Sequence, residues 1–425
     1  MTRVYIETYG CTLNRADSDI MKALLKEKHQ VVESEEESDV IVLNTCTVKG
    51  ATENKIIARM RALSSAGKKF VVAGCMTANE GKLRKIAPHS PLLGTSSLKW
   101  IPDAVDESLE GRITTRKIYE SKDQLPKLLT APIMRIPIND GCLSSCHFCQ
   151  TKLARPYLRS YSPKTVARWI NEGVRHGARE IQLTSMDSGA YGADIKTDLV
   201  SLLESLSKDD SDSQAGLGPF HVRLGMINPD HAARMLDGLI RILAHDRFYK
   251  FLHVPVQSGS EKVCREMNRD HTVSDFVRIA GAVRSALPEA SIATDIIVGY
   301  PTETEEDYRE TISLLNRVKP EVANISRFSP RPGTKAKELK QLPNEEIKRR
   351  SGEVFALMRK IGEERRRIHI GKAYRVLVTE KEKDFKGRNI NYQQVVIRGF
   401  EGKLGDFVDV RITGANHGSL FGEPL

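Results

Sequence analysis

The sequence predicts an α/β protein in three parts: an N-terminal α/β domain with a parallel sheet, a central partial (β/α)6 barrel, and a small antiparallel C-terminal β-barrel of the OB type. Three observations lead to this prediction. Short apolar runs alternate with helical patterns along most of the chain, which is typical of βα units. The last stretch instead carries short β-type runs split by Gly- and Asn-containing turns. A chain of 425 residues also exceeds what one hydrophobic core supports.

The N-terminal domain, residues 1–105, repeats a unit of apolar strand, cysteine and helical pattern. The expected strands are Val4–Thr8, Val40–Asn44 and Phe70–Ala73. They lead into Cys11, Cys46 and Cys75, respectively. Open α/β sheets bind ligands at the carboxyl ends of their strands, so we expect these three thiols to converge. The alternative is that each cysteine is a small buried side chain of the core.

A linker and a second alternation follow. Charge, Gly and Pro mix without a clear period from Asp103 to Pro132, so residues 106–132 are interpreted as a linker. The strands expected within residues 133–368 are Ile133–Asn139, Glu180–Asp187, His221–Asn228, Phe251–Ser258, Ser291–Tyr300 and Val322–Ser329. The helices expected between them are Pro163–Gly177, Asp198–Lys208, Pro229–Leu243, Val273–Leu287 and Thr304–Val318. Six such units predict a partial barrel with its active face at the strand carboxyl ends, and Lys208–Pro219 is interpreted as a flexible surface insertion.

The C-terminal domain, residues 369–425, follows a charged helix expected over Glu345–His369. Its expected strands are Arg375–Glu380, Gln393–Ile397, Phe407–Thr413 and Ser419–Gly422. Small barrels of this style bind nucleic acid through basic and aromatic residues on an exposed strand face. The candidates here are Arg375, Arg388, Tyr392, Arg398 and Arg411. The alternative is a barrel with a structural role only.

The run GCLSSCHFC, directly after the apolar stretch Ile133–Ile138, presents Cys142, Cys146 and Cys149 from one loop. A cubane iron–sulfur cluster normally takes four cysteine ligands. Three local ligands leave one iron open for a non-protein ligand, as a catalytic centre requires. A zinc site and three unrelated thiols are the alternatives, but zinc usually requires a fourth Cys or His at regular spacing.

Composition narrows the class further. The formal net charge of +10 suits an anionic partner such as nucleic acid. No stretch approaches the roughly 20 apolar residues that span a bilayer, so we expect no membrane segment and a cytoplasmic location. Seven cysteines are an odd number for a disulfide framework, whereas a reducing compartment keeps thiols free to bind metal.

Several motifs occur together in a fixed order: TYGCTLN, NTCTVKG, AGCM, the three-cysteine loop, HVPVQSGSEKVCREMNRDHT, DIIVGYPTETEEDY and FSPRPGT. In this order they resemble the methylthiotransferase family of the radical S-adenosylmethionine superfamily, from about Val4 to the end of the chain. The C-terminal barrel resembles the TRAM domain, an RNA-binding module of that family. One departure is Arg155-Pro156, where family members commonly carry Arg-Gly.

The resemblance implies an enzyme with two 4Fe-4S clusters that uses S-adenosyl-L-methionine. Cys142, Cys146 and Cys149 would hold the catalytic, radical-generating cluster. Cys11, Cys46 and Cys75 would hold an auxiliary cluster, whose open iron binds the sulfur to be transferred. An electron donor and a sulfur source would be further partners, and the oligomeric state is not predicted.

Other residues at predicted strand ends receive candidate roles. The candidates for cofactor binding are Asp187, Gln257, Ser258 and Arg327. The candidates for substrate binding are Tyr191, Arg331, Arg375, Arg388 and Tyr392. A packing or hydrogen-bonding role is the alternative for Asp187, Tyr191, Gln257, Ser258, Arg327 and Arg331. Cys264 is interpreted as a buried small side chain.

TYGCTLN, GAYG and GYPTETEEDY are most similar to the archaeal and eukaryotic type of this family. That type converts N6-threonylcarbamoyladenosine, beside the anticodon of tRNA, to its 2-methylthio form. The alternatives within the family are an enzyme acting on isopentenyladenosine in tRNA and one acting on a ribosomal-protein aspartate. A non-catalytic iron–sulfur RNA-binding protein is the alternative from another class.

Overall fold

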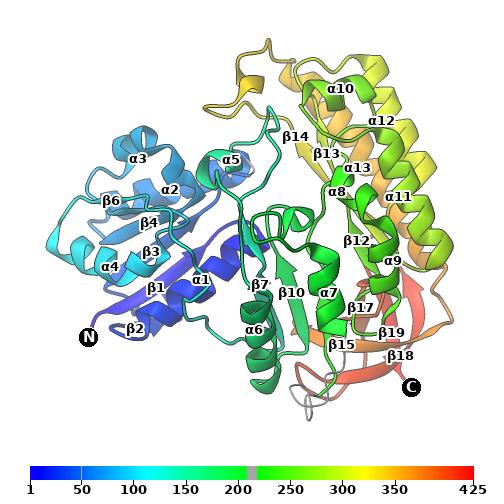
Figure 1. The fold of residues 1–425 in the computed structure, drawn as a ribbon, viewed down its shortest axis with the longest axis horizontal. Coiled ribbons are helices and arrows are strands. Elements are labelled where there is room, and N and C mark those ends of the chain that lie inside the picture. The colour runs from blue at the N-terminus through cyan, green and yellow to red at the C-terminus, as the bar shows by residue number, and fades with distance from the viewer. Residues whose placement is uncertain (49, 208–217) are drawn as a thin grey trace.

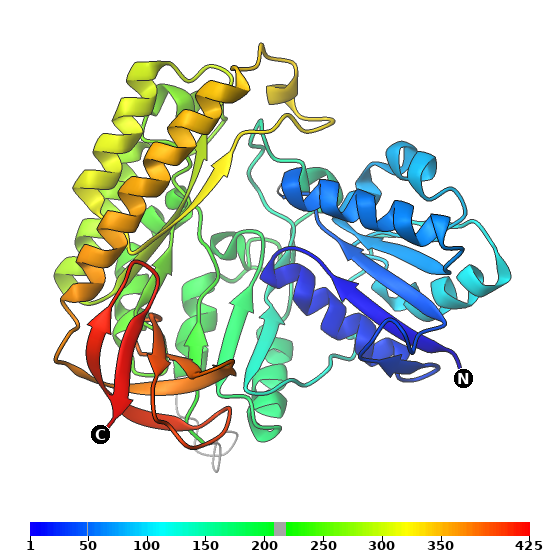
Figure 2. The ribbon, with the colours of Figure 1, turned by 180° about the vertical axis from the view of Figure 1, so that it is seen from behind.

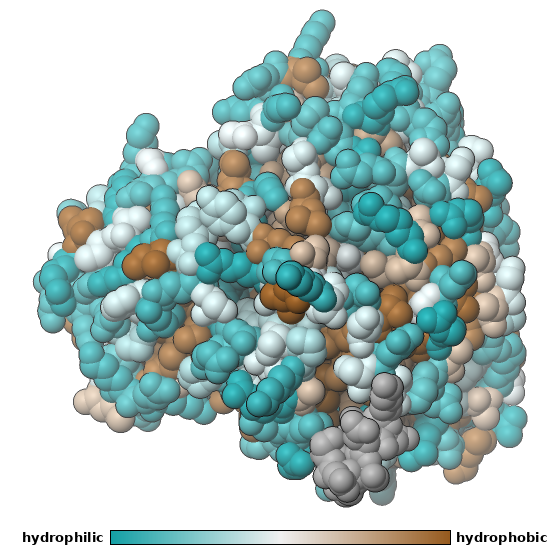
Figure 3. Space-filling model, viewed as in Figure 1, coloured by the Kyte–Doolittle hydropathy of each residue, from teal (hydrophilic) through white to brown (hydrophobic). Residues whose placement is uncertain are grey.

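A computed structural model describes residues 1–48, 50–207 and 218–425 of the chain. Figure 1 shows an N-terminal α/β unit, a larger α/β unit and a small β-barrel at the C-terminal end. The insertion expected at Lys208–Pro219 lies, for residues 208–217, outside the described residues. Hydrophobic residues are scattered among hydrophilic ones on the face shown in Figure 3. Among the described residues, no helix has the length and apolarity that crossing a membrane requires.

The N-terminal unit is a six-stranded parallel sheet in the order β2-β1-β3-β4-β5-β6. Its strands are β1 (Arg3–Thr8), β2 (Gln30–Val32), β3 (Val40–Thr45), β4 (Phe70–Gly74), β5 (Leu92–Leu93) and β6 (Thr115–Arg116). Its helices are α1 (Thr12–Leu25), α2 (Gly50–Ser65), η1 (Cys75–Ala78), α3 (Glu80–Ile86), η2 (Leu98–Trp100) and α4 (Ile101–Glu110). Every residue of β3 and β4 is buried, because α1 and α4 cover one face of the sheet while α2 and α3 cover the other.

This unit extends further along the chain than the sequence pattern indicates. The linker expected from Asp103 onward is instead helix α4 and then β6, an edge strand of the sheet. Helix α4 buries Ile101, Ala104 and Val105, a short apolar face that the surrounding charged residues obscure in the sequence. The irregular connector between the two α/β units is therefore confined to residues 117–132.

The central unit contains six parallel strands in chain order. They are β7 (Ile133–Pro137), β10 (Glu180–Thr184), β11 (His221–Arg223), β12 (Phe251–His253), β13 (Ser291–Val298) and β14 (Val322–Arg327). Two three-stranded sheets are joined through a parallel bridge between Val222 and Phe248. In the described parts of the chain β7 pairs only with β10, and β14 only with β13, so the barrel is incomplete as predicted.

Helices surround this partial barrel and share one core with its strands. They are α5 (Thr151–Ala154), α6 (Pro163–Arg175), η3 (Ser188–Ala190), α7 (Leu199–Ser207), α8 (Pro229–Arg234), α9 (Leu236–Ala244), α10 (Glu261–Glu266), α11 (Val273–Ala286), α12 (Glu305–Val318), η4 (Lys335–Lys337) and α13 (Asn344–Arg367). The short antiparallel pair β8 (Asn139–Asp140) and β9 (Arg159–Ser160) closes the base of the three-cysteine loop.

The C-terminal unit is a closed barrel in the order β15-β16-β17-β19-β18. Its strands are β15 (Ala373–Lys381), β16 (Phe385–Arg388), β17 (Gln394–Ile397), β18 (Phe407–Ala415) and β19 (Leu420–Pro424). Strand β16 was not predicted, because its FKGR sequence reads as a turn. One pair, β17 with β19, is parallel, although an antiparallel barrel was expected. The predicted α/β fold class with a terminal barrel is otherwise confirmed.

The small barrel packs against the amino ends of the central strands. Lys250, just before β12, donates its backbone N–H to the carbonyl of Ile390 at 2.8 Å. Glu289, just before β13, accepts from Lys372 and Tyr374 at 2.6 and 2.9 Å. Helix α13 runs along the central unit and leads into this barrel, as Figure 2 shows from behind. The three-cysteine loop follows the carboxyl end of β7, so the small barrel and that loop lie at opposite ends of the central strands.

Candidate functional site

Glycine residues shape the loops that carry the thiols. Gly10, Gly74 and Gly141 each precede a cysteine, and their φ angles are +99°, +89° and +77°. L side chains rarely adopt such backbone conformations. A Cβ on Gly10 would lie 2.5 Å from the Cys46 sulfur, and one on Gly141 would lie 2.0 Å from the Tyr157 carbonyl oxygen. The chain therefore turns sharply at each site, directly before a thiol.

The three N-terminal thiols are neighbours at the carboxyl end of the sheet. Cys11 precedes α1, Cys46 follows β3, and Cys75 opens η1. The pKa of Cys75 is raised to about 12, chiefly by burial; Arg155 lowers it, and the nearby Cys11 and Cys46 groups contribute to the rise. Burial also raises the pKa of Cys46, with Cys11 contributing in the same direction. Such mutual effects require the three sulfur atoms to lie within electrostatic range of one another.

Two asparagines hold these loops in place. The side-chain amide of Asn14 donates to the carbonyl of Tyr9 at 2.6 Å and to that of Thr45 at 3.2 Å. Asn44 donates back to the Asn14 carbonyl at 2.8 Å. Both asparagines are buried, so their bonds satisfy backbone groups that water cannot reach. The loops after β1 and β3 are thereby fixed to each other.

The second cysteine loop is fixed to the segment after α10. The backbone N–H of His147 donates to the Met267 carbonyl at 3.0 Å, and its Nδ1 lies 2.8 Å from the Glu266 carbonyl. Asn268, at a φ of +56°, donates to the Ser145 hydroxyl at 2.9 Å. Lys152 donates to the Cys142 carbonyl. The positions of the thiols in this loop are thus set by contacts outside the loop itself.

One arginine lies beside each set of thiols. Arg269 Nη1 donates to the Cys146 sulfur at 3.1 Å, and its Nη2 donates to the Asn228 side-chain oxygen at 2.8 Å. Arg155 lies close enough to Cys75 for its charge to lower the pKa of that thiol. Sequence reasoning did not find either arginine. Arg269 lies 123 residues from its cysteine, so the pair has no local signal in the sequence.

The donor set fits a cluster better than a single ion. In the described part of the chain, no group of three or more His, Cys, Asp or Glu side chains is arranged to hold one metal ion. In a cubane each thiolate binds a different iron, so its ligands need not surround one point. Two sets of three thiols, with Arg269 beside Cys146 and Arg155 beside Cys75, suit the binding of iron–sulfur clusters. Cys264, in contrast, is buried and directs its thiol to the Ser258 carbonyl at 3.4 Å.

The Asp187 carboxylate accepts four hydrogen bonds from neighbouring residues. Its carboxylate accepts from the backbone N–H groups of Gly189 and Asn228, both at 3.0 Å. It also accepts from the Asn228 amide at 2.9 Å and from His231 Nδ1 at 2.8 Å. Its side chain is fully buried, and these four bonds engage its oxygens. These bonds give Asp187 the hydrogen-bonding role that was the alternative, and its contact with a cofactor stays a prediction.

Three further strand-end residues also have protein partners. The Tyr191 hydroxyl is buried and donates to the Tyr161 carbonyl at 2.8 Å, and its role in substrate binding stays a prediction. Ser258 is fully buried and accepts from the Ser260 N–H at 3.2 Å, and its role in cofactor binding stays a prediction. Gln257 has a φ of +72°, and no hydrogen bond joins its side-chain amide to the described residues. Gln257 therefore stays a candidate for cofactor binding.

The two arginines after β13 differ in their surroundings. Arg331 is buried and pairs with Glu53 of α2 at 2.5 Å, so it joins the central unit to the N-terminal one. Its expected role in substrate binding stays a prediction. Arg327 is exposed at the end of β14, and its Nε donates to the Ser351 hydroxyl at 2.8 Å. Its role in cofactor binding stays a prediction.

The candidates in the small barrel also separate into two groups. The Tyr392 hydroxyl donates to Glu180 at 3.0 Å, and its ring contacts Tyr249 and Phe251 of the central unit. Tyr392 is therefore an interface residue, and its role in substrate binding stays a prediction. Arg388 lies over the Tyr392 ring and Arg375 over that of Phe407. Arg398 and Arg411 are exposed. For these four arginines, RNA contact stays a prediction.

Models of known families match three parts of the chain. The descriptions are "Uncharacterized protein family UPF0004" for residues 3–94, "Radical SAM superfamily" for residues 136–315 and "TRAM domain" for residues 368–425. Among solved structures, the radical S-adenosylmethionine methyltransferase TsrM from Kitasatospora setae is similar, with a TM-score of 0.56 at 13% identity. The match covers 79% of this chain and 75% of that one, and it shows similarity of fold.

Similar full-length sequences share one name. The "Probable threonylcarbamoyladenosine tRNA methylthiotransferase" of Archaeoglobus fulgidus is 42% identical over 99% of this chain and 98% of its own length. The protein of the same name from Pyrococcus horikoshii is 39% identical, over 100% and 99%. The "Threonylcarbamoyladenosine tRNA methylthiotransferase" of Drosophila melanogaster is 36% identical, over 100% of this chain and 78% of its own.

Proposed function

The chain belongs to the family of threonylcarbamoyladenosine tRNA methylthiotransferases, and we propose on this premise that it converts N6-threonylcarbamoyladenosine in tRNA to the 2-methylthio form. The enzyme class is that of radical S-adenosylmethionine methylthiotransferases. The observation that carries the proposal is the meeting of two three-cysteine sets. Helix α5, which follows Cys149 closely, packs against η1, which begins at Cys75.

We assign one 4Fe-4S cluster to each set of thiols. Cys142, Cys146 and Cys149 would hold the cluster that binds S-adenosylmethionine, and Cys11, Cys46 and Cys75 would hold the auxiliary cluster. When bound, these groups supply the radical source and the sulfur for the reaction. An aromatic C–H bond resists acid–base catalysis, so the chain must exclude water and aim the reacting groups at one atom. The buried position of Cys46, Cys75 and Cys142 supports such a site.

Two arginines supply positive charge beside the proposed cluster ligands. Arg269 at Cys146 and Arg155 at Cys75 place a fixed positive charge beside a thiolate ligand of each cluster. Hydrogen bonds to cluster sulfurs are among the factors that set reduction potential. An electron donor and a sulfur source are needed as partners in the reaction.

The proposed substrate suits the arrangement of the units. The net charge of +10 favours a polyanion, and the TRAM barrel lies at the end of the central strands opposite to the thiols. A ligand that contacts both must extend along the central unit, as a folded tRNA can and a free nucleoside cannot. The target base must leave its stack to reach the thiol face. With tRNA as the substrate, we place the protein in the cytoplasm.

Mass spectrometry of tRNA nucleosides tests this proposal. Cells lacking the gene should lose the 2-methylthio-N6-threonylcarbamoyl nucleoside, and the wild-type gene should restore it. Genes encoding Cys146→Ala or Cys75→Ala should not restore it, because each variant lacks one ligand of one cluster. Loss of a methylthio-isopentenyl nucleoside instead would favour that substrate. An unchanged nucleoside profile would favour the ribosomal-protein or the non-catalytic alternative.

A further inference from the structure

Four buried charged side chains meet where the N-terminal unit, the connector and the central unit join. Lys122 pairs with Asp17 at 2.8 Å and with Asp140 at 2.5 Å. Arg155 pairs with Asp17 at 2.5 Å and also with Asp140. We call Asp17, Lys122, Asp140 and Arg155 the charge tetrad. Each member is less than 9% exposed, so water contributes little to its solvation.

The members of the charge tetrad come from different segments. Asp17 lies on α1, just after Cys11, and Lys122 lies in the connector. Asp140 lies on β8, immediately before Gly141 and Cys142, and Arg155 follows α5. Asp17 therefore lies near Cys11, the first cysteine of one set, and Asp140 lies near Cys142, the first cysteine of the other. One guanidinium bonds to both carboxylates across the junction of the two units.

Arg155 is also close enough to Cys75 for its charge to lower the pKa of that thiol. At the same time, its guanidinium donates to Asp17 and to Asp140. A planar guanidinium offers five donors in fixed directions, whereas a lysine ammonium is a compact point charge. The two cationic and two anionic groups balance within the tetrad, so removal of one cation leaves a buried carboxylate uncompensated.

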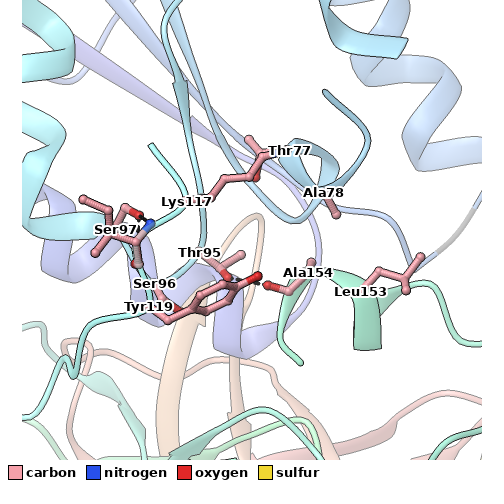
Figure 4. A pocket seen from close by; sticks show the side chains of 11 residues that line it. Thr77, Ala78, Thr95, Ser96, Ser97, Lys117, Tyr119, Leu153 and Ala154 are labelled. Atoms are coloured by element: carbon pink, nitrogen blue, oxygen red, sulfur yellow. Dashed lines mark hydrogen bonds between the residues drawn. The ribbon is translucent and has the colours of Figure 1, made fainter. Parts of the chain in front are cut away.

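The neighbouring backbone is held across the same junction. The Thr95 hydroxyl of the N-terminal unit donates to the Ala154 carbonyl at 2.8 Å, a bond drawn in Figure 4. A small pocket opens beside it, lined by Thr77 and Ala78 from η1 and by Leu153 from α5. The chain directly before Arg155 therefore packs against the segment that begins at Cys75.

We propose that Arg155 is a positioning residue that holds the N-terminal cysteine set against the Cys142–Cys149 loop. The proposal rests on the proposed function, because sulfur insertion needs the two cysteine sets to face one site in a fixed geometry. A buried guanidinium beside Cys75 also favours the more reduced state of a group that this cysteine ligates. The proline at position 156 supports this role, because its fixed φ limits the conformations of the chain right after Arg155.

The first test uses the protein without clusters or tRNA, so failure of the proposed substrate cannot affect it. Limited proteolysis within the connector, residues 117–132, reports how firmly the two units are joined. In Arg155→Met, cleavage should be about tenfold faster, because the buried carboxylate pair has lost one of the two cations that bridge it. Arg284→Met is the matched control, since Arg284 is a partly buried arginine paired with Glu321 at 3.1 Å outside this junction. Its connector should be cut at the parent rate.

The second test measures the reduction potential of the auxiliary cluster in the absence of the other cluster. In a parent protein carrying Cys142→Ala, Cys146→Ala and Cys149→Ala, only the auxiliary site can be reconstituted. Added Arg155→Met should keep its iron and shift its reduction potential to a more negative value, as followed by electron paramagnetic resonance. Lys122→Met, which breaks tetrad pairs without touching Cys75, should leave the potential nearer to that of the parent.

Unchanged connector cleavage and an unchanged potential in Arg155→Met would overturn the proposal. If Arg155→Met does not fold, Arg155→Lys takes its place, because it retains the buried charge but cannot reach all three partners. Faster connector cleavage with a shifted potential in Arg155→Lys supports the proposal. Values equal to those of the parent overturn it.

Discussion

The Tyr392 hydroxyl, in the turn between β16 and β17, donates to the carboxylate of Glu180, the first residue of β10, at 3.0 Å. The Tyr392 ring meets the rings of Tyr249 and Phe251 at centroid distances of 4.8 and 4.9 Å. These contacts fix the TRAM barrel to the amino end of the central strands. The TRAM barrel is therefore held in one orientation relative to the thiols at the other end.

Removal of the Tyr392 ring should loosen this attachment. Tyr392→Ala is expected to lower the free energy of unfolding by about 2 kcal/mol, because a large, partly buried ring that packs on two aromatic rings is lost. Tyr392→Phe keeps the ring and should lose about 1 kcal/mol for the hydrogen bond. Denaturant unfolding followed by tyrosine fluorescence measures both. Phe355→Ala, at a ring that is 57% exposed, should change stability by less than about 0.5 kcal/mol. Equal stability of Tyr392→Ala and the parent would contradict the assigned interface.

Arg269 is expected to tune the cluster held by Cys142, Cys146 and Cys149. Loss of its hydrogen bond to Cys146 in Arg269→Met should reduce cleavage of S-adenosylmethionine by about 10- to 100-fold. Iron content should stay at the parent value, because the three thiols are unchanged. Formation of 5′-deoxyadenosine under reducing conditions measures the effect. The control is Arg265→Met, at an exposed arginine on the neighbouring α10. Parent activity in Arg269→Met would show that its charge does not act on the cluster.

The sequence predicts those elements whose pattern is local. Runs such as Val40–Asn44 and Phe70–Ala73 are buried on both faces, so they are apolar throughout and easily recognised. Helix α4 was missed because it buries only a narrow face, and β16 because its short FKGR run includes a glycine. In both cases the tertiary neighbours supply most of the stabilisation, and neighbours are not visible in the sequence.

The same distinction applies to the site. Cysteines at strand ends can be found from spacing, because parallel strands end at one edge of a sheet. Asp187, Tyr191 and Ser258 lie near the ends of predicted strands, yet their side chains bond to the protein itself. The direction of a side chain at a strand end depends on the loop that follows, which the strand pattern does not fix. Arg155 and Arg269 reach their cysteines only through the folded chain.

The buried pair between Arg331 and Glu53 should join the N-terminal and central units. Among the residues that the structure describes, Arg331→Met leaves Glu53 with Lys82, at 2.5 Å, as its one ionic partner. We expect a loss of about 3 kcal/mol in the free energy of unfolding of the N-terminal unit, because a buried carboxylate loses a partner. A double-mutant cycle with Glu53→Gln should show that the two losses are not additive. Additive losses would mean that the pair does not couple the two units.

His231 should make stability depend on pH. Burial lowers the pKa of His231, but the hydrogen bond from its Nδ1 to Asp187 and the charges of Asp187 and Asp230 outweigh this, so the pKa is raised. A group with a raised pKa in the folded state stabilises the protein fully below its unfolded pKa, about 6.5. This contribution is lost as the pH rises through the folded pKa. The parent should therefore lose about 1 kcal/mol more than His231→Asn as the pH is raised from below 6.5 to well above the folded pKa.

Thermal unfolding at a series of pH values measures this difference. The two proteins should diverge at low pH, where the histidinium is paired, and converge at high pH, where the ring is neutral. A difference that stays constant over the whole range would show that His231 does not titrate against Asp187. Arg234, which lies near His231 and lowers its pKa, provides a second check. In Arg234→Met, the loss of stability should move to higher pH.

Gly10→Ala should disrupt the auxiliary site while leaving the other site intact. Gly10 has a φ of +99°, and an added Cβ would lie 2.5 Å from both the Cys46 sulfur and its Cβ. The loop must move to accept the methyl group, and Cys11 and Cys46 move with it. Iron bound after anaerobic reconstitution should fall from about eight to about four atoms per chain.

Gly67→Ala is the matched control, because Gly67 also has a positive φ, +65°, but nothing lies within 4 Å of its added Cβ. That variant should lose only about 1 kcal/mol of stability from backbone strain and bind iron like the parent. Equal iron content in the two variants would mean that the sharp turn before Cys11 is not needed to assemble the site.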